Sequence, residues 1–270
     1  MATVSDVATP IASYHHRDFP LADLRAMKKD ELISVCIPAH DEQATVGAIV
    51  ETLRRELVDA AGLVDELLVV DDRSEDGTAL VARAAGARIV SVPKIDGSAV
   101  PTGGKGEAMR RGLGASSGDI VVFLDGDVEN FGTHFVTGLL GPILAFPQTV
   151  LVKACYRRPF GESPAGGGRV TELVARPIVS LLFPELSGVT QPLAGEVAVR
   201  REVLERLELA DGYGVELGML IDVSRLYGVE SIAQVDLEVR AHRNRPLHEL
   251  APQARDVLDI ALRRAGVRVA

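Results

Sequence analysis

The chain contains only two cysteines, fewer basic than acidic residues, and no long uninterrupted apolar run. Cys36 and Cys155 each lie inside an apolar segment, which indicates buried reduced thiols and disfavours a disulfide framework or a metal knuckle. Lys+Arg number 29 and Asp+Glu 38, so the net charge of −9 disfavours a broad basic face for nucleic acid. No run reaches the ~18 apolar residues of a membrane span, and no cationic-then-apolar leader opens the chain. We therefore expect a soluble, cytoplasmic protein.

The overall composition is that of an ordinary globular protein. Of 270 residues, 47% are hydrophobic and 25% charged, which excludes a wholly disordered chain. No low-complexity linker and no internal repeat divides the sequence. We expect an irregular N-terminal arm over residues 1–30 and a single domain over 31–270, with one half at 31–130 and a second half at 131–270.

Short apolar runs alternate with helical stretches after the arm. The runs at 33–38, 66–71, 87–92 and 119–125 are rich in β-branched residues and apolar on both faces, which predicts buried, mostly parallel strands. The stretches between them, at 44–60, 76–86 and 105–116, have the length of crossover helices. This order predicts an α/β fold with an open, doubly wound sheet, and such sheets bind ligands at the carboxyl ends of their strands.

Acidic residues follow three of these predicted strands. Residues 38–42 read PAHDE, the second strand ends in Asp71 and Asp72, and the fourth ends in Asp125-Gly126-Asp127. A D-x-D triplet puts two carboxylates on one side of an extended segment, where they can hold a divalent cation and phosphate oxygens. Many such triplets are solvated turns. Its position at the end of a buried strand favours the cation site.

Two glycine-rich segments and one basic segment could receive an anion. Residues 102–107 and 166–172 each run into a predicted helix, whose first amides point at bound anions, and 240–245 read RAHRNR. Met109 stands where a dinucleotide fingerprint needs glycine, so neither that motif nor a P-loop is present. Taken singly, these segments could also be flexible loops or solvated charges. His242 alone would more often be structural.

Taken together, several segments of the sequence resemble one family. They are PAHDE, DD, GGKGEA, DGD, KACYRRP, GGGRVTELVARP, QPLAGE, GYGVE and VRAHRNRPL, spread from about residue 18 to residue 250. The chain resembles the glucosyl-3-phosphoglycerate synthases, which are retaining glycosyltransferases of the GT-A fold. The resemblance implies a Rossmann-like, mostly parallel sheet flanked by helices, with a nucleotide-sugar half and a C-terminal acceptor-binding half.

The same resemblance implies an activity and its cofactor. Members pass glucose from a nucleoside-diphosphate glucose, here expected to be UDP-glucose, to the 2-hydroxyl of D-3-phosphoglycerate, with retention at the anomeric carbon. They use Mg²⁺, or Mn²⁺ or Co²⁺, and they are homodimers.

The resemblance also assigns residues. Asp127 and His242 would bind the metal, and Glu216 and Asp125 would be catalytic. The acceptor would lie on Gly168, Arg169, Thr171 and Asn244. The nucleotide sugar would contact Pro38, Ala39, Glu42, Asp72, Lys105, Asp125, Gly126 and Arg240.

The sequence departs from the family pattern at four positions within these segments. His40 and Asp41 replace the leucine and asparagine of the usual first motif, Asp72 stands where a serine is usual, and Gly126 replaces a serine between the two aspartates. These changes bear on the donor base and sugar. A mannosyl-3-phosphoglycerate synthase using GDP-mannose is therefore an alternative.

Two alternatives come from other classes of protein. A sugar-phosphate nucleotidyltransferase also uses an α/β sheet and paired aspartates, but places a glycine-rich basic loop after its first strand, where this chain has PAHDEQATVG. A non-catalytic nucleotide-sugar sensor would bind the donor without turnover.

Two routes to retention remain open at this stage. In the first, the acceptor attacks on the face that the diphosphate leaves, and the leaving phosphate takes its proton. In the second, Glu216 is a nucleophile. The helix around Glu216 is predicted to be amphipathic, so Glu216 could also lie on its solvent face.

Overall fold

The computed structural model describes residues 11–93, 104–159, 168–241 and 246–268. Its centre is one eight-stranded sheet in the order β1-β8-β6-β7-β5-β2-β3-β4. The strands are β1 (Ala12–His15), β2 (Ile33–Ala39), β3 (Glu66–Asp71), β4 (Arg88–Ser91), β5 (Ile120–Phe123), β6 (Leu151–Arg157), β7 (Val197–Arg200) and β8 (Ile232–Val239). Only the pairings of β7 with β5 and β6 are antiparallel, so the prediction of an open, mostly parallel sheet is confirmed.

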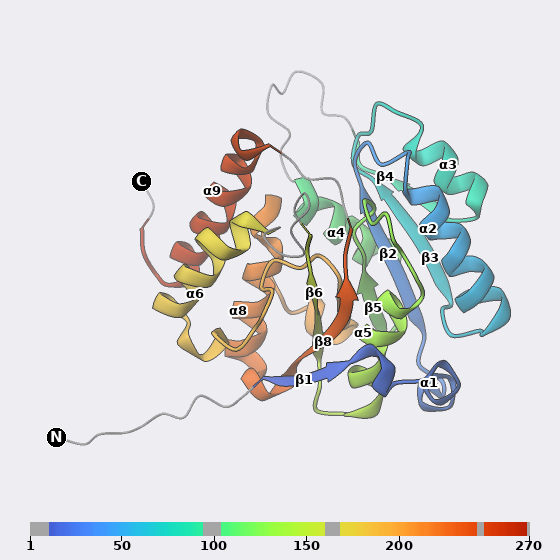
Figure 1. The fold of residues 1–270 in the computed structure, drawn as a ribbon, viewed down its shortest axis with the longest axis horizontal. Helices are drawn as coiled ribbons and strands as arrows, with labels where there is room; N and C mark the ends of the chain where they lie inside the picture. Colours follow the sequence, from blue (N-terminus) through green and yellow to red (C-terminus); the bar gives the residue numbers. More distant parts are fainter. Residues whose placement is uncertain (1–10, 94–103, 160–167, 242–245, 269–270) are drawn as a thin grey trace.

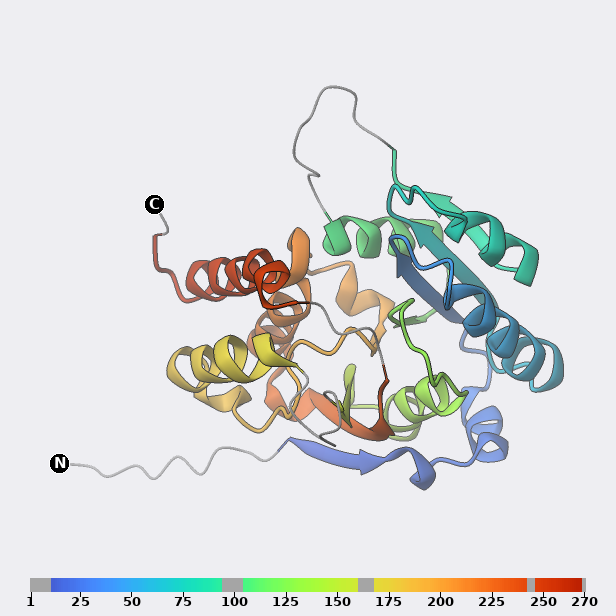
Figure 2. The ribbon, with the colours of Figure 1, turned by 45° about the horizontal axis from the view of Figure 1, so that its top comes forward.

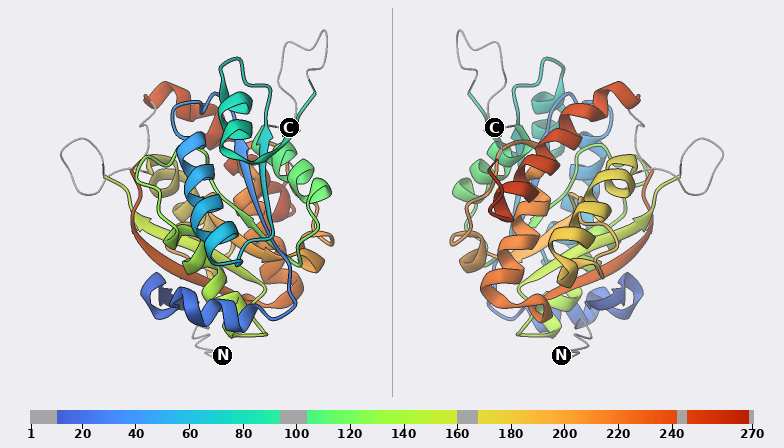
Figure 3. Two further views of the ribbon diagram at one scale, coloured as in Figure 1. Left: turned by 90° about the vertical axis from the view of Figure 1, so that its right-hand side faces the viewer. Right: turned by 90° about the vertical axis from the view of Figure 1, so that its left-hand side faces the viewer.

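Helices cover both faces of the sheet, as Figures 1 and 3 show from three directions. The α-helices are α1 (Leu21–Lys28), α2 (Val46–Leu53), α3 (Thr78–Ala85), α4 (Gly104–Ala115), α5 (His134–Ala145), α6 (Arg176–Leu182), α7 (Arg201–Leu204), α8 (Val215–Tyr227) and α9 (Leu247–Arg264). Short 3₁₀ and π turns complete them: η1 (His16–Asp18), η2 (Arg54–Ala60), η3 (Thr171–Ala175), η4 (Pro184–Leu186), η5 (Gly212–Gly214) and η6 (Val229–Ser231). No helix within the described ranges is long and apolar enough to cross a membrane.

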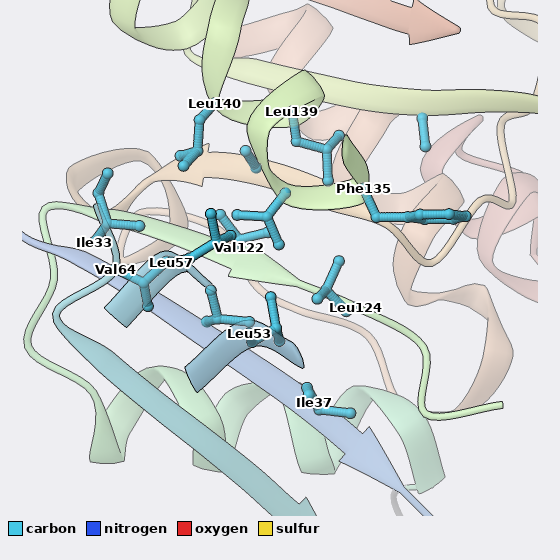
Figure 4. Packing of buried hydrophobic residues seen from close by; sticks show 14 of the residues in the cluster. Ile33, Ile37, Leu53, Leu57, Val64, Val122, Leu124, Phe135, Leu139 and Leu140 are labelled. Atoms are coloured by element: carbon cyan, nitrogen blue, oxygen red, sulfur yellow. The ribbon is translucent and has the colours of Figure 1, made fainter. Parts of the chain in front are cut away.

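Two apolar cores lie on opposite faces of the sheet because alternate strand residues point to opposite sides. Val35 and Ile37 of β2 belong to one cluster with Leu53 of α2 and Phe135 of α5. Figure 4 shows Ile37, Leu53 and Phe135 in this cluster. Cys36, between Val35 and Ile37 in the sequence, packs on the other face with residues of α4, α6, α8 and α9. Figure 2 shows α6, α8 and α9 gathered on that side. Because both faces of the central strands are covered by apolar cores, these strands contain few polar residues.

The N-terminal arm differs from the sequence prediction in its described part. Residues 12–15 form β1, which pairs in parallel with β8 at the sheet edge, and 21–28 form α1 against α5. The prediction of an irregular arm is therefore wrong for these residues. β1 has only four residues, of which Ala12 and Ser13 are exposed and Tyr14 and His15 half-buried, so the pattern is too short to predict a strand.

Two further expectations need correction. β4 is the other edge strand, and Arg88 and Ser91 are exposed, so it is not buried on both faces. Both cysteines are free thiols, as predicted, but only Cys36 is fully buried while Cys155 is half-buried. Burial raises the pKa of each thiol to about 12, which makes both poor nucleophiles.

Candidate active site

The predicted acidic strand ends meet at one edge of the sheet. β2 lies between β3 and β5, and Ala39 pairs with Asp71 while Cys36 pairs with Phe123. The amide of Asp72 donates to the carbonyl of Ala39 at 2.8 Å. The segments 38–42, 71–72 and 125–127 therefore adjoin one another, as expected for carboxyl ends of parallel strands.

Lys105 joins two of the predicted catalytic side chains. It lies in the first turn of α4, and its Nζ is 2.5 Å from Asp125 Oδ1 and 2.6 Å from Glu216 Oε1. Glu216 lies in the first turn of α8 and is only 3% exposed, so the alternative of a solvent-facing Glu216 is wrong. The end of β5 and the first turns of α4 and α8 thus bring both carboxylates to one ammonium.

The charges in this group stabilise one another. Burial alone would lower the pKa of Lys105, but the Asp125 and Glu216 carboxylates outweigh it and raise that pKa well above its usual value. Burial would raise the pKa of Asp125, but Lys105 and Arg240 lower it far below its usual value. Lys105 is therefore a cation and Asp125 an anion at any physiological pH.

Arg240 binds both aspartates of the D-x-D triplet. It follows β8 directly, and its Nη2 lies 2.8 Å from Asp125 Oδ2 and 2.5 Å from Asp127 Oδ1. Its Nε donates to Glu196 Oε1 at 2.7 Å. The Arg240 side chain is 2% exposed and Glu196 is 0% exposed, so this is an ion-pair network inside the protein, not a surface contact.

The network continues to a second arginine. Tyr156 of β6 donates to Glu196 Oε2 at 2.6 Å, and Arg158 donates to the Tyr156 hydroxyl at 2.7 Å. The guanidinium carbons of Arg158 and Arg240 lie 5.0 Å and 5.7 Å from the Tyr156 ring centroid, within cation–π range. Burial raises the pKa of Tyr156, so its hydroxyl keeps its proton. The arginines are thereby fixed in place.

Gly195 lies directly against the Lys105–Asp125 ion pair. A Cβ at this position would overlap Asp125 Oδ1 and Lys105 Nζ. The preceding residue, Ala194, accepts a hydrogen bond through its carbonyl from Lys153 of β6. Lys153 is 0% exposed, and burial lowers its pKa to about 8 although Glu216, Glu196 and Asp125 all favour its charged form.

Sequence reasoning assigned no role to Lys153, Tyr156, Glu196 or Gly195. Two signals were available: the family segments KACYRRP and QPLAGE contain these four residues, and Lys153 is a charged residue inside the apolar strand LVKACYR. A lysine in a fully buried strand is rare unless it has a partner. The partners of Glu196 and Gly195 lie far along the chain, so spacing gives no signal for them.

Hydrogen bonds to Gly126 and Thr78 fix the segment that follows β2. Thr45 Oγ1 donates to the Gly126 carbonyl at 2.6 Å, and the Glu42 amide donates to Thr78 Oγ1 at 2.8 Å. Gly126 is not required by crowding, since a Cβ there would lie 3.5 Å from Ala39 Cβ and Glu42 Cγ. Pro38 and Ala39 are the last two residues of β2 and lead into this segment.

Asp72 lies beside the end of β2 and forms an ion pair with Arg73. Its Oδ1 is 2.5 Å from Arg73 Nη1, and Arg73 also binds Glu107 of α4 at 2.7 Å. Its backbone carbonyl lies 2.6 Å from His40 Nδ1. Two of the four residues that depart from the family pattern, His40 and Asp72, thus contact each other.

Gly106, which follows Lys105 in the GGKGE segment, allows two parts of the chain to pack closely. A Cβ on Gly106 would overlap the carbonyl of Ala210, so the glycine lets α4 lie against the chain before α8. This close approach brings the first turn of α4 to the first turn of α8. Lys105 and Glu216 lie in those two turns.

Of the residues predicted to bind the acceptor, Gly168 lies next to Arg158. Gly168 has φ +76° and a Cβ there would lie 3.6 Å from Arg158 Cδ. Thr171 is buried, and Arg169 is half-buried at the start of the helical segment that η3 and α6 continue. Asn244 and His242 lie outside the described residues.

The chain next to His242 is anchored close to the D-x-D triplet. The carbonyl of Ala241 accepts from the Glu129 amide at 3.0 Å, and the Ala241 amide donates to Asn130 Oδ1 at 2.8 Å. The side chain of Asn130 also donates to the Val239 carbonyl at 2.8 Å. The end of β8 is therefore joined to the loop that follows Asp127.

The donor set at this edge suits a hard divalent cation. Asp127 is 30% exposed at its side chain, and its carboxylate is of the kind that binds Mg²⁺ or Mn²⁺. In the structure, Arg240 neutralises Asp125 and Asp127 together. One guanidinium therefore contacts oxygens of both carboxylates.

Comparisons with known proteins agree with this arrangement. The sequence pattern of glycosyl transferase family 2 matches residues 34–207. The glucosyl-3-phosphoglycerate synthase of Mycolicibacterium smegmatis is 48% identical over 94% of this chain and 84% of its own length. That of Petrotoga mobilis is 45% identical over 93% of this chain and 80% of its own length.

Solved structures give the same result. The crystal structure of glucosyl-3-phosphoglycerate synthase from Mycobacterium tuberculosis in complex with Mn²⁺, UDP-glucose and phosphoglyceric acid has a TM-score of 0.87 and 46% identity. The match covers 97% of this chain and 90% of that one, which confirms the expected GT-A sheet. The chain belongs to glycosyl transferase family 2 and, within it, to the glucosyl-3-phosphoglycerate synthases.

Proposed function

We propose that this enzyme transfers glucose from UDP-glucose to the 2-hydroxyl of 3-phosphoglycerate, with retention at the anomeric carbon. The observation that carries the proposal is the buried network in which Lys105 and Arg240 hold Asp125, Asp127 and Glu216 at the strand ends. Structures of the M. tuberculosis relative contain UDP-glucose with phosphoglyceric acid, and UDP with glucosyl-3-phosphoglycerate. These complexes do not favour the mannosyl alternative.

The donor would lie along the edge formed by β2, β3 and β5. Pro38, Ala39, Glu42, Asp72 and Gly126 would border it there, and Lys105 and Asp125 would lie beside them. Arg240 would turn from the aspartates toward the diphosphate when a metal neutralises them. Because a buried cation without its partners is costly, the anion would replace the carboxylates as the partner of Arg240.

Asp127 and His242 would hold Mg²⁺ or Mn²⁺, the ions found in structures of the M. tuberculosis relative. The bound ion would supply Lewis-acid stabilisation of the negative charge on the departing diphosphate. The hydrogen bonds of Ala241 to the loop after Asp127 support a pairing of these two residues. Asp125 and Lys105 would orient the sugar beside them.

The acceptor would lie on the opposite side of the donor, at the start of η3. Gly168 offers its amide, Arg169 a guanidinium and Thr171 a hydroxyl to the phosphate and carboxylate of phosphoglycerate, with Asn244 as a further contact. Arg158 lies against Gly168 and adds positive charge. Correct orientation of the 2-hydroxyl would supply much of the rate.

The position of Glu216 supports same-face attack. One of its oxygens is held by Lys105 at 2.6 Å, which stabilises the carboxylate and reduces its reactivity as a nucleophile. Replacing Glu216 with Gln tests this. Turnover within about tenfold of wild type excludes a covalent intermediate on Glu216, whereas loss of all turnover with rescue by azide would establish one.

The activity itself is tested by the mass of the product. The enzyme is incubated with 3-phosphoglycerate, Mg²⁺ and, in turn, UDP-glucose, ADP-glucose, GDP-glucose and GDP-mannose. We expect a glucosyl-phosphoglycerate, formed fastest from UDP-glucose. A product with GDP-mannose alone, or release of pyrophosphate from UTP and glucose 1-phosphate, would contradict the proposal.

Three further properties belong to the same proposal. We assign residues 31–130 to the donor and 131–270 to the acceptor, although β1 and α1 complete the sheet and its cover. Two free thiols fit a cytoplasmic location. A homodimer follows from the family resemblance, and light scattering coupled to size-exclusion chromatography tests it.

A further inference from the structure

A cluster of metal-ligating side chains lies outside the active site, where β1 meets β8. His15 ends β1, His16 begins η1, and Glu238 is near the end of β8. Glu238 Oε1 is 3.3 Å from His16 Nε2 and 3.8 Å from His15 Nε2, and the three ligand atoms lie within 4.8 Å of one another. Within the described ranges no other group of three such residues comes as close.

These spacings approach those of a tetrahedral metal site. Bonds of about 2.0–2.2 Å to nitrogen and oxygen place neighbouring ligand atoms about 3.4 Å apart. The His16–Glu238 pair already meets this value. The side chain of His15 is 36% exposed and can rotate to close the remaining gap.

One ligand atom has no hydrogen-bond partner among the described residues. His16 Nε2 is fully buried, and its approach to Glu238 lacks hydrogen-bond geometry. A buried nitrogen in this state is destabilising, and binding of a metal ion would satisfy it. The ring of His16 is held by the rings of His15 and His134 at centroid distances of 4.6 Å and 4.8 Å.

The backbone of Glu238 is also strained. Its φ is +69°, a left-handed conformation that non-glycine residues rarely adopt. Its amide donates to Asp236 Oδ1 at 2.7 Å, which stabilises the irregular backbone at the end of β8. Such strain is found where a side chain must be aimed at a site.

Two contacts would change when an ion enters. Arg17 now pairs with Glu238 Oε1, but its side chain is 72% exposed and can move to the second oxygen. His15 Nδ1 accepts from the Arg17 amide at 3.2 Å. A metal on Nε2 requires the imidazole proton on Nδ1, so this exposed contact would be given up.

We propose that His15, His16 and Glu238 form a second metal site, which binds a transition ion such as Zn²⁺, Ni²⁺ or Co²⁺ and ties β1 to β8. Imidazole nitrogen favours these ions, whereas Mg²⁺ prefers oxygen ligands and would not compete. The two strands pair in parallel through residues 12–15 and 233–236, and they run together along the edge of the sheet in Figures 1 and 2. The site shares no residue with the metal site proposed at Asp127 and His242, and Glu238 lies two residues before Arg240 in the sequence.

The test counts Zn²⁺ ions per chain by calorimetry on the untagged, metal-stripped full chain. We expect wild type to bind one more ion than the His16→Gln and Glu238→Gln variants, or the variants to bind it at least 100-fold more weakly. The matched control is His248→Gln, because His248 is an exposed histidine beside a glutamate, 4.0 Å from Glu249, outside the cluster. It should bind Zn²⁺ like wild type.

A second readout separates this site from the one at Asp127. In the Asp127→Asn background, Co²⁺ should give the intense visible absorption of a tetrahedral ion, and adding His16→Gln should remove it. Far-ultraviolet circular dichroism in EDTA confirms that each variant is folded. Equal Zn²⁺ stoichiometry and affinity in wild type, His16→Gln and Glu238→Gln would overturn the proposal, as would an octahedral Co²⁺ spectrum in the Asp127→Asn chain.

Discussion

Lys105 Nζ contacts Asp125 at 2.5 Å and Glu216 at 2.6 Å, so one ammonium joins the end of β5 to the start of α8. Replacing Lys105 with Met leaves two buried carboxylates without this partner. We expect a loss of about 3–5 kcal/mol in the free energy of unfolding and at least 100-fold lower turnover. Urea denaturation and steady-state kinetics measure the two effects.

Lys28→Met is the matched control for that variant. Lys28 is 7% exposed and pairs with Asp65 at 2.7 Å, away from the strand ends. Its replacement should lower stability while the KM values for both substrates stay within twofold of wild type. Equal losses of turnover in both folded variants would show that Lys105 acts only through stability.

Gly195→Ala tests the close approach to the same ion pair. The added methyl group would overlap Asp125 Oδ1 and Lys105 Nζ, so these side chains must separate. We expect about 1–3 kcal/mol lower stability and at least 30-fold lower kcat. Gly114→Ala in α4 is the control, because no atom lies within 4 Å of its Cβ position. Wild-type kcat in Gly195→Ala would show that this contact is dispensable.

The strands that carry the site could be predicted because β2, β3 and β5 are buried on both faces, so their sequences are almost purely apolar. The acidic residues that follow them could then be placed on one edge. β1 could not be predicted, since none of its four residues is buried and the strand is stabilised by pairing with β8.

The ion-pair network could be predicted only in part. Lys105, Asp125 and Arg240 carried a family motif, but the sequence does not show which groups pair. Arg240 and Glu196 meet because β8 and the start of β7 both adjoin β6. Contacts of this kind depend on strand order, which spacing along the chain does not reveal.

Lys153 gives the stability a defined pH dependence. Burial lowers its pKa in the folded state from 10.5 to about 8. Between these values the unfolded chain binds more protons, so stability rises with pH as the folded lysine loses its charge first. Relative to Lys153→Met, wild type should gain about 2 kcal/mol in the free energy of unfolding between pH 7.5 and 9.5. Urea titrations at both pH values measure this, and a constant difference would contradict it.

Arg169→Ala tests the proposed acceptor site. Loss of a charge-paired contact should raise the KM for 3-phosphoglycerate by roughly 30-fold to several-hundred-fold, with little change in the KM for UDP-glucose. Arg176→Ala is the control, since Arg176 is exposed and pairs only loosely with Glu172, at 3.6 Å. An unchanged acceptor KM in Arg169→Ala would remove Arg169 from the site.

Calorimetric titration of UDP with and without Mg²⁺, in wild type and Asp127→Asn, tests most directly whether the strand-end carboxylates bind a metal-diphosphate unit. We expect wild type to bind UDP at least tenfold more tightly with Mg²⁺ than in EDTA, and Asp127→Asn to lose this difference. UDP affinity in wild type that is the same in Mg²⁺ and in EDTA would contradict the account.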